Sequence, residues 1–387
     1  MKPRLTAIAL CSILFSTNAA LGAPKDKLLD IDVAPRYVWF AYSNGVSSIY
    51  ETLSGALRRY ERSTQTWQTF TLQDIFGTSF EADVKAVATD GDRTVWVGVE
   101  PLVGHTIPYA CAFSHDNGAH WTVRSASDGL AANAVKCIAI DPVTQAIWVG
   151  HGLNDATHCI SSSTDGGTTW TTFSPNSDYG IIEIAAYDAI VWAAADYNGY
   201  KPLMKSIDRG NSWQYFDSSD TPALCDSCDV TDLCMVSPDE VHCTVYTEFS
   251  ANSSSGAYCY TLDGGATWQT RQVKGYQDYG QTVAVEPWGT VWLGQRWYPP
   301  ETIYRSEDSG QSWQGFNITT DLPYDDPFVI RYDPYAKIVW AGFWGNSFTN
   351  YQSAWCWTGD DGNTWHTDAP PPILFSGLPD SMWQDYR

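Results

Sequence analysis

Short apolar runs built around a tryptophan recur along the chain at similar intervals. Each has an aliphatic residue, then Trp, then a second apolar residue that Gly or Ala often follows, and a short apolar stretch and a turn come before it. Six copies are centred on Trp39, Trp96, Trp148, Trp192, Trp292 and Trp340, and Val241-His242-Cys243 takes the same place in a seventh. Short runs rich in β-branched and aromatic residues and bounded by turn residues predict β-strands.

A second pattern, Ser/Thr-x-Asp-x-Gly-x-x-Trp, follows six of these runs. Its copies end at Trp121, Trp170, Trp213, Trp268, Trp313 and Trp365. The first unit ends at Trp67 and keeps the Trp but has lost the Asp and the Gly. Successive ends are 43 to 55 residues apart. A repeat of this length predicts a propeller or a solenoid.

The chemistry of the second pattern is that of a tight hairpin. An Asp side chain accepts hydrogen bonds from backbone N–H groups just downstream, and Gly two residues later adopts a positive φ at no steric cost. The Trp then begins the next strand and offers a large apolar face for burial. We therefore interpret the repeated acids as turn-forming rather than catalytic; they are Asp116, Asp165, Asp208, Asp263, Asp308 and Asp360.

Four strands are expected in each unit. In the second unit they are Val84–Thr89, Thr94–Val99, Tyr109–Ser114 and Trp121–Arg124. Four strands per repeat describe a propeller blade. The sequence predicts an all-β fold, a seven-bladed β-propeller of four-stranded antiparallel blades; a sandwich would not explain the repeat.

The repeated hairpin resembles the Asp-box, or BNR repeat, of a β-propeller superfamily. Its members include sialidases, xyloglucan-active glycoside hydrolases, sortilin-type receptors and a photosystem II assembly factor. The resemblance implies a propeller with Asp-box hairpins. It implies no single activity, because these proteins share the turn and not a reaction.

The two ends of the chain differ from the repeats. Residues 1–23 have the features of a secretory signal peptide: Lys2 and Arg4, then an apolar run that is too short to span a bilayer, then small residues for cleavage. We expect export, to a secreted or periplasmic location, and a propeller over 24–368. The Pro-rich tail, 369–387, is expected to pack on the propeller.

The net charge limits the classes of binding partner, and the cysteine content indicates the compartment. The formal net charge of −22 argues against nucleic acid and against insertion into anionic membranes. Nine of the ten cysteines follow the signal segment, which suits an oxidising compartment. Cys225-x-x-Cys228 is interpreted as a local disulfide, and Cys137, Cys234, Cys259 and Cys356 as small core residues. We expect no metal, no cofactor and a monomer.

Candidate ligand-binding residues gather in the connections between second and third strands and between blades. These connections share one face of a propeller, and loops on a rigid scaffold often carry function. Aromatic rings bury the apolar face of a pyranose, while polar side chains take its hydroxyls. The candidates are Trp297, Tyr298, Trp344, Tyr279, Tyr200 and Arg296. The alternative is that these rings only plug the ring centre or pack neighbouring loops.

Two functional hypotheses remain. The first is a protein that binds, and in its stronger form hydrolyses, a neutral or weakly charged glycan. Hydrolysis needs two carboxylates flanking one bond, for which Asp178, Glu248, Asp278 and Asp325 are unmarked candidates. Xyloglucan-active relatives place these acids between two propellers, and the arginine triad of sialidases is not visible here. The second hypothesis is a non-catalytic protein-binding scaffold or assembly factor.

Overall fold

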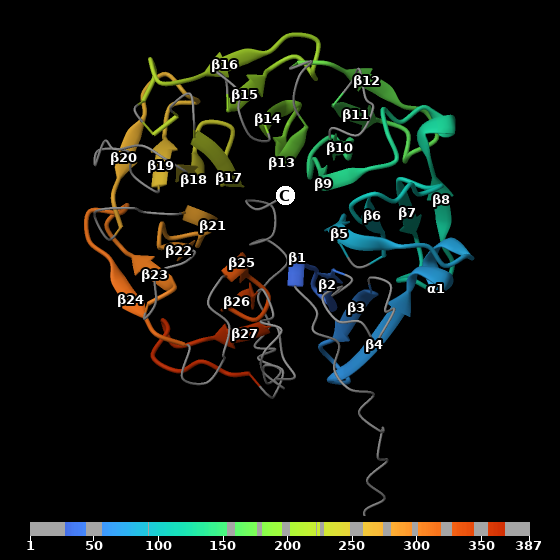
Figure 1. Ribbon diagram of the computed structural model, residues 1–387. Helices are drawn as coiled ribbons and strands as arrows, with labels where there is room; N and C mark the ends of the chain where they lie inside the picture. Colours follow the sequence, from blue (N-terminus) through green and yellow to red (C-terminus); the bar gives the residue numbers. More distant parts are fainter. Residues whose placement is uncertain are drawn as a thin grey trace, which may run out of the picture.

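The protein is a ring of seven antiparallel sheets arranged around a central axis (Figure 1). The computed structural model describes residues 28–43, 56–91, 93–152, 159–175, 180–195, 202–221, 223–224, 228–247, 258–273, 280–295, 301–318, 327–343 and 355–367. The first strand of each blade is the innermost, and the last described strand lies at the circumference. The predicted seven-bladed, all-β propeller is confirmed.

Each sheet is formed by consecutive strands. Blades one to three contain β1 Leu28–Val33, β2 Tyr37–Tyr42, β3 Ala56–Glu61, β4 Thr66–Thr71; β5 Ala82–Thr89, β6 Val95–Pro101, β7 Cys111–Ser114, β8 Thr122–Arg124; β9 Val135–Ile140, β10 Ile147–His151, β11 Ile160–Ser163 and β12 Thr171–Phe173. Blades four and five contain β13 Ile181–Tyr187, β14 Ile190–Ala195, β15 Leu203–Ser206, β16 Gln214–Phe216; β17 Cys228–Met235, β18 Val241–Thr247, β19 Tyr258–Thr261 and β20 Gln269–Arg271.

The last two blades contain β21 Gly280–Val285, β22 Val291–Gln295, β23 Ile303–Ser306, β24 Gln314–Phe316; β25 Pro327–Asp333, β26 Ile338–Phe343 and β27 Trp355–Thr358. Within the described residues, blade seven has three strands, and a single bridge between Trp357 and His366 stands in the place of a fourth. The helix α1 spans Leu72–Phe76, and a 3-10 turn spans Ala126–Asp128. No helix in the described part of the chain is long and apolar enough to traverse a bilayer.

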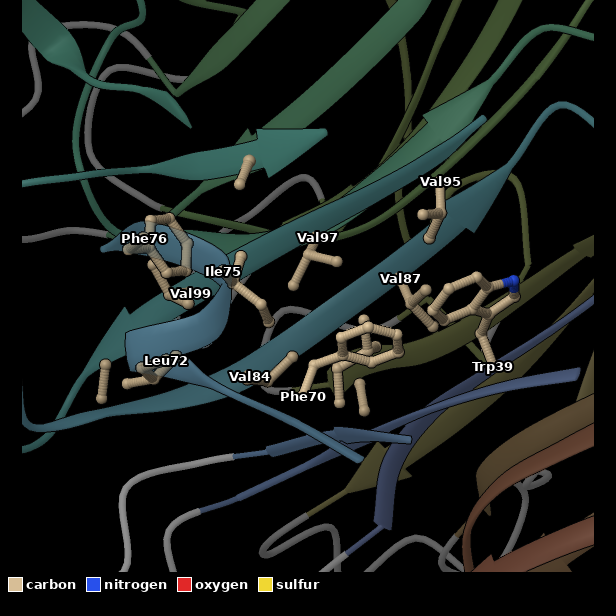
Figure 2. Packing of buried hydrophobic residues seen from close by; sticks show 14 of the residues in the cluster. Trp39, Phe70, Leu72, Ile75, Phe76, Val84, Val87, Val95, Val97 and Val99 are labelled. Atoms are coloured by element: carbon tan, nitrogen blue, oxygen red, sulfur yellow. The ribbon is translucent and has the colours of Figure 1, made fainter. Parts of the chain in front are cut away.

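The tryptophans of the second strands form the interior. All six are at most 1% exposed. In five blades this ring packs at a low interplanar angle on a phenylalanine of the same blade. The phenylalanine belongs to the third strand in blade two, where Trp96 stacks on Phe113 at 23°, and to the fourth strand in the other four blades. Figure 2 shows the start of this core, where Trp39 and Phe70 of blade one meet Val84 and Val87 of blade two.

Blade five differs because His242 replaces the tryptophan. A buried imidazole needs hydrogen-bond partners, and here it has two. One ring nitrogen lies 2.6 Å from the Tyr258 hydroxyl, and the other lies 2.9 Å from Glu240 Oε1. The polar substitution in the core is therefore satisfied within its own blade.

The repeated hairpins have the predicted turn chemistry. In the first copy, Asp116 Oδ1 accepts hydrogen bonds from Ser114 Oγ at 2.8 Å and from the His120 backbone N–H at 2.8 Å. Ser114 Oγ also accepts the Gly118 N–H at 2.7 Å. The same bonds recur in the other five copies, so the six acids are turn-formers.

The glycine of each hairpin has a second role that the sequence analysis missed. Gly167 has φ +81°, and a Cβ built on it would lie 2.3 Å from the Trp96 ring of the preceding blade. A Cβ built on any of the other five hairpin glycines would also lie within 3.1 Å of an aromatic ring of the preceding blade. Each hairpin therefore packs tightly on its neighbour, and only glycine leaves enough room.

The tryptophan that closes each of the six hairpins is partly buried. Trp170 stands edge-on to Trp96, with ring centroids 5.9 Å apart and planes at 83°. Trp268 and Trp365 repeat this arrangement on Trp192 and Trp292. The fourth strand lies at the circumference, where one side of these rings remains open to solvent.

Candidate functional site

Second strands end and first strands begin at the same edge of the ring. We call the loop rim the edge of the ring where second strands end and first strands begin. The candidates Tyr200, Tyr279, Arg296, Trp297, Tyr298 and Trp344 lie outside the described residues, as do Asp178, Glu248, Asp278 and Asp325. All of them occur in segments whose flanking described strand ends lie at the loop rim.

Every innermost strand carries an irregularity close to this rim. In β1 the register shifts between Leu28 and Asp30, and each of the other six first strands shifts at the corresponding place. Bulges of this kind re-aim side chains and are over-represented beside functional sites. The residue after the shift is, in blade order, Asp30, Ala86, Cys137, Glu183, Asp232, Thr282 and Val329.

Three of the acids near the axis hold adjacent blades together. Asp30 accepts the Val87 N–H of blade two at 3.0 Å and the Ile31 N–H at 2.8 Å. Asp32 accepts the backbone N–H and the hydroxyl of Thr89 in the same way. These N–H groups belong to the free edge of an innermost strand, where no ladder partner exists.

Blades five to seven use the same device. Asp232 Oδ2 accepts the Val283 N–H at 2.9 Å and the Thr282 hydroxyl at 2.7 Å. Thr282 Oγ1 then accepts the Ile330 N–H of blade seven at 2.9 Å. The first role of Asp30, Asp32 and Asp232 is therefore structural.

Arg331 connects acids from strands that do not pair with its own. It lies in β25, two residues after the shifted position, and its guanidinium is 3.5 Å from Asp30 Oδ1 in blade one. The other terminal nitrogen is 3.4 Å from Asp232 Oδ2 in blade five. We call Asp30, Asp32, Glu183, Asp232 and Arg331 the axial cluster. Its four acids outnumber its single cation.

Burial of these acids keeps protons in the cluster. It raises the pKa of Asp30 to about 6, although Arg331 opposes the shift. Burial, reinforced by the charge on Asp232, raises the pKa of Glu183 well above its ordinary value. The pKa of Asp32 is also raised by burial. Near neutral pH the cluster therefore offers both carboxyl O–H donors and carboxylate acceptors.

Glu183 feels charges from three of the other residues of the axial cluster. Asp232 and Asp30 raise the pKa of its carboxyl further, whereas Arg331 and the Ile184 backbone N–H lower it. Two lysines lie near the loop rim on another side of the ring, in blades two and three. Glu100 Oε1 lies 2.6 Å from Lys136 Nζ, and Glu100 Oε2 lies 3.9 Å from Lys85 Nζ. Both lysines occupy the shifted segment of their strand, so the loop rim carries cations as well as acids.

The sequence analysis missed this cluster. A signal was present, because Glu183 and Asp232 interrupt first strands that are otherwise mostly apolar. Nothing in the linear pattern, however, indicated that residues 30, 232 and 331 meet.

The described residues were also compared with the arginine triad of sialidases and with a metal site. Arg36 pairs with Glu61 in blade one, and Arg305 pairs with Glu307 and Asp361, so these two arginines do not join Arg331 in a triad. In the described part of the chain, no three or more His, Cys, Asp or Glu side chains are arranged so that they could hold a metal ion. The Cys225-x-x-Cys228 disulfide stays a prediction, because Cys225 lies outside the described residues.

Comparison with known proteins identifies similar folds but assigns the chain to no family. No protein-family model matches the sequence, and no curated protein matches it. Among solved structures, YCF48 bound to a D1 peptide is similar with a TM-score of 0.56 and 14% identity, over 83% of this chain and 92% of that one. Virginiamycin B lyase from Staphylococcus aureus is similar with a TM-score of 0.54 and 14% identity, over 76% and 85%.

A GH74 xyloglucanase from Xanthomonas campestris is similar with a TM-score of 0.60 and 14% identity. The match covers 89% of this chain and 55% of the xyloglucanase, so the chain spans about half the length of that enzyme. At this level of identity the likenesses show the propeller fold. The similar structures thus include both a peptide-bound YCF48 and a GH74 xyloglucanase.

Proposed function

We propose that this protein is an exported Asp-box propeller that binds a neutral or weakly charged glycan at its loop rim, over the axial cluster. The observation that carries the proposal is that the buried acids and the ends of the aromatic-rich segments lie at the same edge of the ring. The shifted segments of the first strands bring Asp30, Glu183 and Asp232 close to the rim. The aromatic candidates occur in segments that begin and end at the same rim.

The chemistry of the cluster suits hydroxyl groups. A carboxyl that keeps its proton donates a hydrogen bond, and a carboxylate accepts one, so the cluster can take both sides of a sugar hydroxyl. The net charge of −22 disfavours a polyanionic chain. Aromatic rings beside such groups supply the apolar contact that a pyranose face requires.

Affinity electrophoresis tests the proposal. The purified mature protein is run through native gels that contain a neutral polysaccharide such as xyloglucan, and through a gel without polymer. We expect retardation in a neutral-polymer gel, and we expect Trp297→Ala and Trp344→Ala to remove it. Assay of the retained polymer for new reducing ends then distinguishes binding from hydrolysis.

Trp288 supplies a matched control. It lies in the turn between β21 and β22, on the rim opposite the loop rim, and is 62% exposed. Trp288→Ala should leave the retardation unchanged. Equal loss of retardation in all three variants, or no retardation of the wild type in any gel, would refute the glycan site.

A second candidate is a protein-binding scaffold, and one observation favours it. The match covers 92% of the peptide-bound YCF48 but only 55% of the xyloglucanase, so the fold described above accounts for nearly all of the peptide-bound protein. Isothermal titration with extended model peptides of either charge separates the two candidates. Peptide binding that Trp297→Ala weakens, without any glycan effect, would favour the scaffold.

A further inference from the structure

Two cysteines of blade five lie directly opposite each other. Cys243 in β18 is the register partner of Cys259 in the adjacent antiparallel strand β19. Both side chains are 0% exposed, and both belong to the apolar core that contains Leu203 and Phe216 of blade four. Both are free thiols in the structure.

The arrangement needs little movement to become a disulfide. Directly opposed residues of antiparallel strands have Cα atoms about 4.5 to 5.5 Å apart, and disulfides occur at Cα separations of roughly 4.4 to 6.8 Å. Burial raises the pKa of the Cys243 thiol well above its ordinary value, and the neighbouring thiol of Cys259 raises it further.

We propose that Cys243 and Cys259 form a structural disulfide when the chain folds in an oxidising environment. The oxidant is a small-molecule disulfide of the glutathione class. One cysteine thiolate attacks a sulfur of this disulfide and releases one thiol. The second cysteine thiolate then attacks the protein sulfur of the resulting mixed disulfide, which forms the Cys243–Cys259 bond and releases the other small-molecule thiol. The two cysteines lose two electrons and two protons, and the oxidant takes them up as two thiols.

Burial sets the time at which the bond forms. A thiol held protonated in an apolar core is a poor nucleophile, so oxidation has to precede packing of blade five against blade four. The bond joins the two strands that flank 248–257, the segment that includes Glu248. It would therefore hold the base of one of the connections at the loop rim, whatever ligand binds there.

Peptide mapping after oxidative refolding tests the proposal. The reduced, unfolded full-length chain is refolded with reduced and oxidised glutathione. Recovery of strand structure is checked by circular dichroism, and the protein is then unfolded in N-ethylmaleimide and digested without reductant. We expect one linked peptide pair that contains Cys243 and Cys259 and is lighter by two hydrogens than the two thiol peptides.

Blade seven supplies the internal control. Cys356 occupies in β27 the place that Cys259 has in β19, but it faces Ala341. It should carry N-ethylmaleimide in the same sample. In a Cys259→Ala variant, Cys243 should become labelled as well. Maleimide on both Cys243 and Cys259 of the refolded wild type, or linkage of either to another cysteine, would overturn the proposal.

If the protein does not refold, it is instead expressed with export into a bacterial periplasm, which is oxidising. The purified protein is then mapped in the same way, and the same outcomes decide. A thermal measurement adds an independent readout. Repeated unfolding in a phosphine reductant should lower the Tm of the oxidised wild type. The decrease should be smaller in the Cys243→Ala/Cys259→Ala variant, in which only other disulfides can be reduced.

Discussion

Arg62 in blade one and Asp333 in blade seven form a buried ion pair, with 2.7 Å between Arg62 Nη2 and Asp333 Oδ2. Their side chains are 7% and 0% exposed. Arg62 also donates to the Ala34 carbonyl, and Asp333 accepts the Trp340 indole N–H at 3.0 Å. Because blade one contains only β1–β4 and the described strands of blade seven are β25–β27, this pair joins the two ends of the propeller without a shared strand.

Loss of the arginine should therefore open this junction. Arg62→Met leaves the Asp333 carboxylate buried without its cation, and breaking a buried pair from one side costs about 3 to 5 kcal/mol. Urea unfolding measures the loss. Arg36→Met is the control, because Arg36 pairs with Glu61 at 2.6 Å while it is 54% exposed, and an exposed pair contributes about 1 kcal/mol or less. Equal losses in the two variants would contradict the role of the junction.

Two adjacent hairpin glycines separate backbone strain from steric conflict. Both Gly166 and Gly167 have positive φ, +68° and +81°. A Cβ on Gly166 meets nothing within 4 Å, whereas one on Gly167 meets the Trp96 ring at 2.3 Å. Gly166→Ala should cost about 1 kcal/mol of unfolding free energy. Gly167→Ala should cost roughly 1 to 3 kcal/mol more, from overpacking. Thermal unfolding of both variants checks the order, which would be wrong if Gly166→Ala were the less stable.

The two classes of tryptophan should differ in their contribution to stability. Trp96 is 1% exposed, and its removal leaves a cavity, so Trp96→Ala should cost about 3 to 5 kcal/mol. Trp170, which is only partly buried, should cost less on the same substitution because solvent fills part of the space. Chemical denaturation of the two variants makes the comparison. A larger loss for Trp170→Ala would show that the hairpin contacts outweigh the interior ones.

The raised pKa of Glu183 predicts a pH dependence of stability. Burial, with the charge on Asp232, favours the protonated form in the folded state. Above its ordinary pKa the unfolded carboxyl is ionised, so the folded state binds more protons and stability falls as the pH rises through this window. Glu183→Gln keeps the shape and cannot ionise. The variant should lose that part of the slope.

Urea unfolding between pH 6.5 and 8.5 measures this slope above the pKa of Asp30, which is about 6. Glu307→Gln is the control, since Glu307 is 69% exposed and should keep the wild-type slope. An unchanged slope in Glu183→Gln would show that Glu183 is ionised throughout this range in the folded protein.

The blades could be predicted from the sequence because their hairpins depend on local interactions. Asp116 and Gly118 contact residues only a few positions away along the chain, so their spacing to Trp121 was enough to predict a hairpin. The ends of the strands expected in the second unit lie within two residues of the ends of β5, β6, β7 and β8. The count of seven followed because each unit repeats the same local pattern.

Contacts between blades could not be read in this way. The sequence by itself determined the β-strands, the hairpins and the number of blades, because hydrogen bonds within a unit depend on neighbouring residues. Only the tertiary structure decided that Gly167 must make room for Trp96, that Trp96 is buried more deeply than Trp170, and that Arg331 reaches both Asp30 and Asp232. Those relationships arise where the ring brings distant segments together, and the shifted register of each first strand, which no residue type marks, sets the direction of the side chains that meet there.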